Sequence, residues 1–147
     1  MRRTSKTDYG LRALIDLALH ASNAPVQSHD IAVRQGIPES YLNQLLILLR
    51  RAGLIRSLRG PQGGHQLARP PRAISIADIV AALDGPTPPE RGDQPGEARG
   101  NDAATDFVVR AAWEQVNAAV ADALGRITLD TLIEQRARHD TAAMFQI

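Results

Sequence analysis

The chain has 147 residues, 44% of them hydrophobic and 3% aromatic, which suits one domain or one domain with an appendage. It has no cysteine, which excludes disulfides, thiolate chemistry, zinc–thiolate sites and cysteine-held iron–sulfur clusters. No run of eighteen apolar residues occurs, and the basic N-terminus lacks the apolar stretch and cleavage site of a signal peptide. We therefore expect a cytoplasmic protein with no membrane span.

Charge is divided unevenly between the two halves of the chain. Residues 1–72 hold eleven Lys or Arg and four Asp or Glu, a net charge of +7, whereas residues 73–147 hold six and twelve, a net charge of −6. A basic half joined to an acidic half indicates one part that faces nucleic acid and another that faces a different partner. Chance asymmetry between solvated surfaces is the alternative.

Apolar periodicity predicts three helices in the first third of the chain. Hydroxyl residues at positions 4, 5 and 7 can cap the first helix, over 8–22, and Ser28 can cap the second, over 29–35. The third helix is expected over 38–52. Its buried stripe should consist of Leu42, Leu45, Leu46 and Leu49.

A hairpin and a fourth helix are expected next. Two short extended runs, 54–59 and 65–69, flank a glycine-rich stretch, which predicts a β-hairpin with a loop of about five residues. Ser75, with Asp78 three residues later, predicts a capped helix over 76–84.

The remainder of the chain divides into a loop and two helices. Residues 84–104 contain eight Gly or Pro and no apolar periodicity, which predicts a loop or linker. A long helix is expected over 105–125, followed by a helix over 129–137 capped by Thr128 and a frayed tail. One apolar stripe runs along the long helix, formed by Val109, Trp113, Val116, Val120 and Leu124.

Three helices followed by a hairpin is the order of a mainly α, winged helix-turn-helix fold. The small residue Ala32, Gly36 four residues later and the apolar Ile37 are what two closely crossing helices and a tight turn require. Any other helix pair joined by a glycine turn is the alternative. On this fold the third helix would be the recognition helix, whose N-terminal half approaches base edges in the major groove.

Polar side chains on the outward face of that helix suit base recognition. Asn and Gln can pair with the adenine edge. Arg50, Arg51 and Arg56 can meet phosphates, as can Arg2, Arg3 and Lys6 of the N-terminal arm; for each, an ordinary solvated position is the alternative. The outward residues are Ser40, Tyr41, Asn43, Gln44 and Ile47.

The sequence RGPQGGHQLAR, residues 59–69, fits the tip of a wing. Glycines allow positive φ and let backbone amides approach phosphate, and Arg59 can enter a narrow minor groove. A nucleotide-binding loop is disfavoured, because this loop joins two strands and has no lysine. The predicted DNA contacts are Ser28, Ser40, Tyr41, Asn43, Gln44, Arg50, Arg51, Arg59, Gly60, Gln62, Gly63, Gly64 and His65.

Residues 41–85 resemble the Rrf2 family of bacterial winged-helix regulators, and the likeness extends back to Asp8-Tyr9-Gly10 and more loosely over the long helix. The wing that follows LRRAGL is its most specific feature. The resemblance implies a homodimer in which the long helix pairs with its mate through the apolar stripe, and two winged domains that bind a pseudo-palindromic operator. It divides the chain into a DNA-binding domain (1–83), the Pro/Gly-rich loop (84–104), dimerisation helices (105–137) and a tail (138–147).

The chain departs from the family pattern in three ways. Glutamate is usual in the family at the position of Asn43, and an aromatic residue is common at the position of His65. Cluster-binding relatives carry three cysteines in the region corresponding to 84–104, where this chain has none. We therefore predict no iron–sulfur cluster and no other cofactor. The four histidines at 20, 29, 65 and 139 show no ligand spacing, so no metal site is predicted.

The expected function is therefore sequence-specific binding of double-stranded DNA by a homodimeric transcriptional repressor. Whether a small-molecule or protein effector controls it, or repression is constitutive, stays open. The alternative is a winged-helix module for protein interaction, whose acidic second half would dock a basic partner. An enzyme is disfavoured, because no cysteine nucleophile, no metal-spaced His and carboxylate set and no nucleotide loop in context are present.

Overall fold

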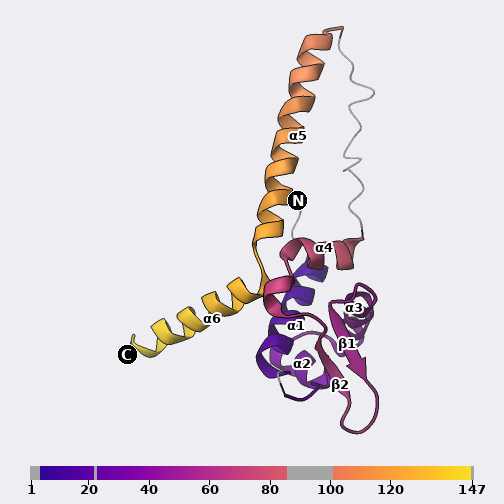
Figure 1. Cartoon of the computed structure of the whole chain (residues 1–147), viewed down its shortest axis with the longest axis vertical. Coiled ribbons are helices and arrows are strands. Elements are labelled where there is room, and N and C mark those ends of the chain that lie inside the picture. The colour runs from indigo at the N-terminus through magenta and orange to yellow at the C-terminus, as the bar shows by residue number, and fades with distance from the viewer. Residues whose placement is uncertain (1–3, 22, 86–100, 147) are drawn as a thin grey trace.

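A computed structural model describes residues 4–21, 23–85 and 101–146. Helices α1 to α4 and the hairpin form one packed unit, from which α5 and α6 project in different directions (Figure 1). This is the predicted mainly α, winged helix-turn-helix arrangement. In chain order the elements are α1 (Ser5–His20), α2 (Ser28–Gln35), α3 (Glu39–Arg51), β1 (Ile55–Leu58), β2 (Gly64–Leu67), the 3₁₀ helix η1 (Pro71–Ala73), α4 (Ile76–Asp84), α5 (Ala103–Arg126) and α6 (Leu129–Met144).

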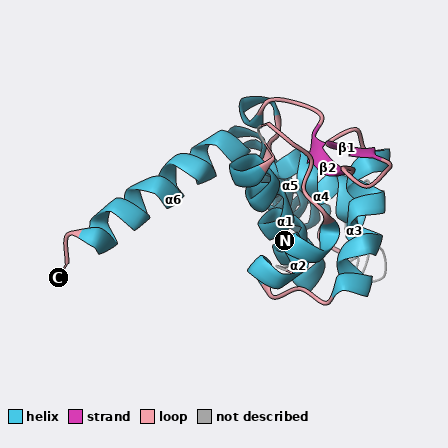
Figure 2. Cartoon of the chain, turned by 90° about the horizontal axis from the view of Figure 1, so that it is seen from below, coloured by secondary structure: helices cyan, strands magenta, loops and turns pink. Residues whose placement is uncertain are grey.

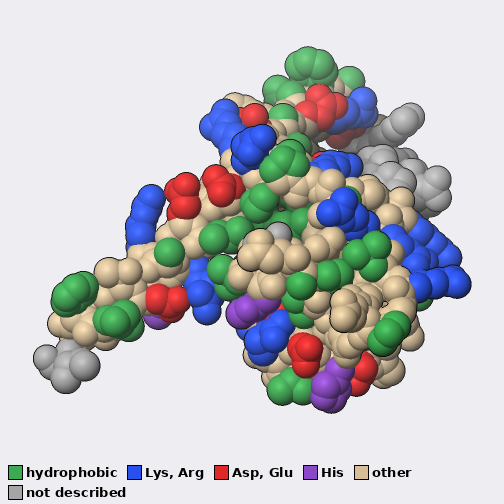
Figure 3. All heavy atoms as spheres, turned by 60° about the horizontal axis from the view of Figure 1, so that its bottom comes forward, with side chains coloured by type: hydrophobic (Ala, Val, Ile, Leu, Met, Phe, Trp, Pro, Cys, Tyr) green, Lys and Arg blue, Asp and Glu red, His purple; other side chains and the backbone are tan. Residues whose placement is uncertain are grey.

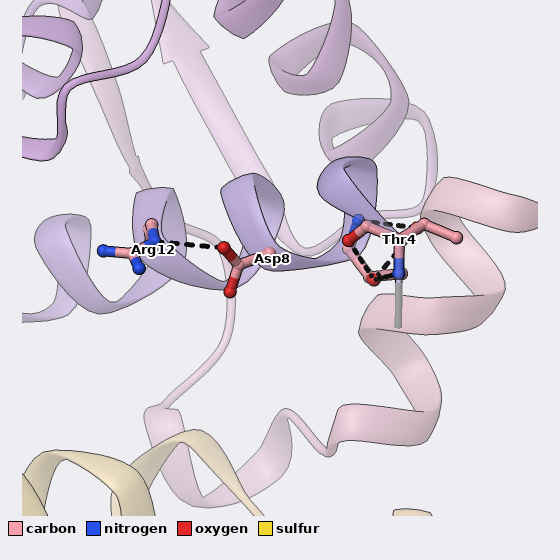
Figure 4. A network of polar contacts seen from close by, with 4 residues as sticks. Thr4, Asp8 and Arg12 are labelled. Atoms are coloured by element: carbon pink, nitrogen blue, oxygen red, sulfur yellow. Dashed lines mark hydrogen bonds and ion pairs between the residues drawn. The ribbon is translucent and has the colours of Figure 1, made fainter. Parts of the chain in front are cut away.

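Helix α1 begins at a reciprocal threonine cap. The Thr4 hydroxyl accepts a hydrogen bond from the Thr7 amide (3.2 Å), and the Thr4 amide donates to the Thr7 hydroxyl (3.3 Å). One turn later Asp8 accepts a hydrogen bond from Nε of Arg12 at 3.3 Å (Figure 4). The cap satisfies amides that the first turn leaves unpaired. Helix α1 therefore starts at Ser5, three residues before the predicted start at residue 8.

The core is built from aliphatic side chains of α1 to α4 and β1. The predicted leucine stripe of α3 is buried, with Leu42, Leu45, Leu46 and Leu49 all at most 3% exposed. The turn between α2 and α3 is also as predicted. Gly36 has φ +64, a conformation that favours glycine, and the amide of the buried Ile37 donates to the carbonyl of Ala32 at 3.0 Å.

The wing is an antiparallel hairpin with the predicted five-residue loop, 59–63. Its register pairs Ile55 with Leu67 and Ser57 with His65. Val26, from the α1–α2 connection, adds a bridge on the free edge of β2, donating to the His65 carbonyl (3.0 Å) and accepting from the His65 amide (2.8 Å). The wing is therefore held against the helical part by its own second strand, beside α3 (Figure 2).

Besides the start of α1, other predicted helix ends need correction. Ser28 does not cap α2: it is the first helical residue, and the residue before it, Gln27, makes no side-chain capping bond. The tail is not frayed from His139, because α6 continues to Met144. Helix α5 starts at Ala103, where Asp102 accepts hydrogen bonds from the Ala104 and Thr105 amides.

Other predicted boundaries are confirmed. Ser75 and Asp78 form the expected capping box, and Thr128 caps α6. Most of the predicted loop over 84–104 lies outside the described residues, and the division of the chain into functional parts stays a prediction.

The junction of α5 and α6 is anchored to the winged-helix part. The Ile76 amide donates to the Ile127 carbonyl (2.9 Å), and the Leu129 amide donates to the Ile74 carbonyl (2.8 Å). Leu129 is fully buried and belongs to the core. The end of α5 and the start of α6 are therefore both fixed to the winged-helix part. Within the described residues, none of the helices has the length and apolarity needed to cross a membrane.

Candidate nucleic-acid interface

Helix α3 turns its leucines inward and a polar face outward. Ser40, Asn43 and Gln44 are exposed, as predicted. Tyr41 differs from the prediction, because its half-buried ring packs edge-to-face on Tyr9 of α1, with centroids 5.7 Å apart. The ring is thus part of the α1–α3 packing, and a contact between Tyr41 and DNA stays a prediction.

A groove separates α3 from the wing. Asn43, Leu46, Ile47 and Arg50 line it from the helix, and Ser57 and His65 line it from the two strands. Since Ser57 and His65 are paired across the hairpin, they present one face of the wing to α3. The recognition helix and the wing therefore share one surface.

His65 is a hydrogen-bonding group in this groove and not a cation at neutral pH. Its Nδ1 and the Ser57 hydroxyl share a hydrogen bond of 2.8 Å. Burial, followed by the positive charge of Arg50, lowers the pKa of His65 below its ordinary value. The ring is therefore neutral near pH 7, and its half-buried position fixes its orientation between β1 and α3.

The wing tip exposes Arg59, Gly60 and Gln62. Gly60 has φ +108, and the turn closes through a hydrogen bond of 2.9 Å from the Gly63 amide to the Gly60 carbonyl. An open turn of this kind can present backbone amides to phosphate.

The two later glycines of the wing lie where a side chain does not fit. Gly63 is buried, and a Cβ there would overlap the Leu58 carbonyl oxygen and lie 2.9 Å from that of Gly60. A Cβ at Gly64 would lie 2.6 Å from the Val26 carbonyl oxygen. Close packing, within the wing at Gly63 and against the α1–α2 connection at Gly64, requires both glycines, and their contact with DNA stays a prediction.

The stretch of chain that forms α3 and the wing is rich in arginine, and one of these arginines, Arg50, lines the groove. Residues 40–77 contain six arginines and no Asp or Glu, and all six are exposed. Among the residues that the structure describes, none of the six forms an ion pair. Lys and Arg side chains gather along the right-hand edge of the winged-helix part (Figure 3). The six are Arg50, Arg51, Arg56, Arg59, Arg69 and Arg72.

The remaining predicted contacts lie at the margins. Ser28 is half-buried at the first position of α2, and its contact with DNA stays a prediction. Arg56 is on the hairpin face opposite Ser57, where its Nε donates to the Gln66 side chain at 3.3 Å. Arg2 and Arg3 lie outside the described residues.

Sequence reasoning missed a buried ionic link between α1 and α2. Asp16 is fully buried and accepts hydrogen bonds from Nε (2.9 Å) and Nη2 (2.8 Å) of Arg34 and from Nε2 of Gln35 (2.9 Å). Burial raises the pKa of Asp16, but the hydrogen bonds and the charge of Arg34 outweigh it, so the pKa is lowered overall. The signal in the sequence was an acidic residue between the apolar positions 14 and 17 of α1.

The ligand chemistry of the chain does not fit a cysteine-held iron–sulfur cluster, because the sequence has no thiolate to supply. Over 4–21, 23–85 and 101–146, no three His, Asp or Glu side chains are grouped to hold a metal ion.

Comparisons with known proteins agree with this geometry. The model of the Rrf2 family, iron-dependent transcriptional regulators, matches residues 3–135. The HTH-type transcriptional regulator IscR of Vibrio cholerae is 40% identical over 133 residues, which are 90% of this chain and 75% of that protein.

Two solved structures share the fold. IscR of T. potens has a TM-score of 0.72 and 37% identity, over 92% of this chain and 88% of its own. CymR of B. subtilis, the global cysteine regulator, has a TM-score of 0.74 and 33% identity, over 92% of this chain and 98% of its own. These relatives are transcriptional regulators and not enzymes. The chain therefore belongs to the Rrf2 family and is a DNA-binding transcriptional regulator with a winged helix-turn-helix.

Proposed function

We propose that the protein is a homodimeric repressor that binds a pseudo-palindromic operator through α3 and the wing, without an iron–sulfur cluster. The observation that carries this proposal is the shared groove. The polar face of α3 and one face of the hairpin line it together with Arg50, and residues 40–77, which include both elements, hold six arginines and no Asp or Glu.

In this proposal α3 enters the major groove. Asn43 and Gln44 offer paired donor and acceptor groups to adenine. Arg50 and Arg51 neutralise phosphates at the end of α3, and Arg59 enters the neighbouring minor groove from the wing tip. His65, neutral and held by Ser57, adds a hydrogen bond between the two.

The exposed face of α5 supports the dimer. None of its 24 residues is buried. An apolar stripe left in water over about 23 Å of helix is unfavourable, and pairing with a second copy would cover it. Along the stripe, the exposed fractions are 48% for Val109, 65% for Trp113, 49% for Val116 and 36% for Val120, and Leu124 is half-buried.

Trp113→Glu should therefore convert the dimer to a monomer, since it places a charge in the centre of the stripe. Light scattering coupled to size-exclusion chromatography measures the mass directly. Gln115→Glu, which puts the same charge on the opposite face of α5, is the matched control and should leave a dimer. An unchanged mass for Trp113→Glu would rule out pairing through this stripe.

Arg59→Ala should weaken operator binding about tenfold. The plot of log affinity against log salt should become less steep by about one, because one cation no longer displaces counterions. Fluorescence anisotropy over a salt series, with an operator selected from random duplexes, measures both. Arg136→Ala on α6 is the control and should match wild type. Equal affinity of Arg59→Ala and wild type would remove Arg59 from the interface.

If wild type binds no duplex even near 50 mM salt, where any DNA reader retains nonspecific affinity, a protein-interaction module becomes the better account.

A further inference from the structure

Ile47 is an aliphatic side chain in the middle of the proposed DNA surface. It is 41% exposed and follows Asn43 by four residues, so the two side chains lie on the same face of α3. Both line the groove beside Arg50 and His65. Leu46, the other aliphatic residue of the groove, is 3% exposed, so Ile47 supplies most of the apolar surface that α3 presents there.

An aliphatic group in this position needs an apolar counterpart. Base edges in the major groove present mainly hydrogen-bond donors and acceptors, and the largest apolar group among them is the C5 methyl group of thymine. Placed against a donor or acceptor of a base edge, Ile47 would strip water from a polar atom without replacing the hydrogen bond, which is unfavourable. Arg50 in the groove and the arginine-rich stretch over 40–77 favour DNA as the partner, and the aliphatic side chain of Ile47 favours thymine within it.

We propose that Ile47 is a specificity-determining residue that reads thymine through its methyl group, next to an adenine read by Asn43. This inference rests on the proposed function. Four residues of helix rise about 6 Å, and successive base pairs are about 3.4 Å apart. The thymine therefore lies within about two base pairs of the base that Asn43 contacts, and each half-site has A·T pairs at its centre of recognition.

The test uses the whole protein and the operator selected from random duplexes. Each thymine in turn is replaced by deoxyuridine, which removes the methyl group and leaves the hydrogen-bonding edge intact. At one thymine of each half-site the replacement should weaken wild-type binding about fourfold, the change expected when one buried methyl group is lost. In Ile47→Ala the same replacement should cause no further loss of affinity, whereas Ile47→Val should keep most of the fourfold loss.

A matched control comes from α2. Val33 is an exposed aliphatic residue (68%) that does not line the groove, so Val33→Ala should keep the full deoxyuridine penalty. Circular dichroism verifies that each variant is folded, as expected for changes at exposed positions.

Two results would overturn the proposal: no deoxyuridine replacement weakens wild-type binding, or Ile47→Ala retains the whole penalty. Either would leave the proposed function in place, since wild type would still bind its operator. Failure of wild type to bind any duplex would overturn both.

Discussion

Replacing Arg34 by leucine should lower the free energy of unfolding at neutral pH by about 3–5 kcal/mol. The reason is that the substitution leaves the carboxylate of Asp16 without its positively charged partner. Asp16 is fully buried, and Arg34 donates two of its three hydrogen bonds, at 2.8 and 2.9 Å. Arg34 itself is 36% exposed, so the cost of the substitution comes from the unpaired charge of Asp16. Urea denaturation followed by circular dichroism measures the change.

The pH dependence of stability should differ between this variant and wild type. In wild type the pKa of Asp16 is lowered, so the stabilisation is present above the ordinary value of about 3.9 and is lost as pH falls through the folded-state pKa. In Arg34→Leu, burial remains while the main stabilising charge is gone, so the pKa of Asp16 should rise above its ordinary value. In the variant the contribution of Asp16 to the free energy of unfolding is then most favourable below about pH 3.9 and becomes less favourable as pH rises, so the difference in stability from wild type narrows on acidification.

Two further variants isolate the cause. Arg136→Leu removes an arginine from an exposed pair with Asp140 (2.9 Å) on α6 and should change stability by no more than about 0.5 kcal/mol. The double variant Asp16→Leu, Arg34→Leu should recover much of the loss, since no buried charge remains. If Arg34→Leu unfolds with the wild-type free energy, the link between α1 and α2 contributes no stability.

Local patterns were enough to predict most of the helices and the hairpin. The four leucines of α3 recur at helical spacing, and each is buried because that spacing puts them on one side. The capping box at Ser75 and the positive φ of Gly36 likewise depend on residues within a few positions of each other. The outward placement of Asn43 and Gln44 follows from the same period.

What escaped prediction depends on contacts between distant segments. Asp16 and Arg34 are 18 residues apart, and nothing local marks them as partners. The bridge between Val26 and His65 explains why Gly64 has no side chain, a reason that the wing sequence alone could not supply. The groove is lined by residues of α3 and of both wing strands, so the surroundings of Ile47 could not be predicted from the helical pattern alone.

Gly64→Ala should detach the wing from the helical part while leaving the helices folded. A Cβ at Gly64 would lie 2.6 Å from the carbonyl oxygen and 2.7 Å from the carbonyl carbon of Val26, and φ is +149. The backbone of Val26 cannot yield as the end of a flexible side chain could. The two hydrogen bonds between Val26 and His65 must therefore lengthen or break, with an expected loss of about 1–3 kcal/mol in stability.

Operator affinity should fall by at least about tenfold, because a displaced wing withdraws Arg59 and His65 from the surface they share with α3. Anisotropy measures affinity, circular dichroism measures helix content, and amide hydrogen exchange should show lost protection at Val26 and His65.

Gly60→Ala, where φ is +108 but nothing lies within 4 Å of the added Cβ, should cost backbone strain and keep the bridge protected. Gly125→Ala, in open space near the end of α5, should be neutral or stabilising by up to about 1 kcal/mol. Retained protection at both amides together with weakened binding would show that Gly64 acts on DNA directly, and retained affinity would show that the wing needs no anchor at Val26.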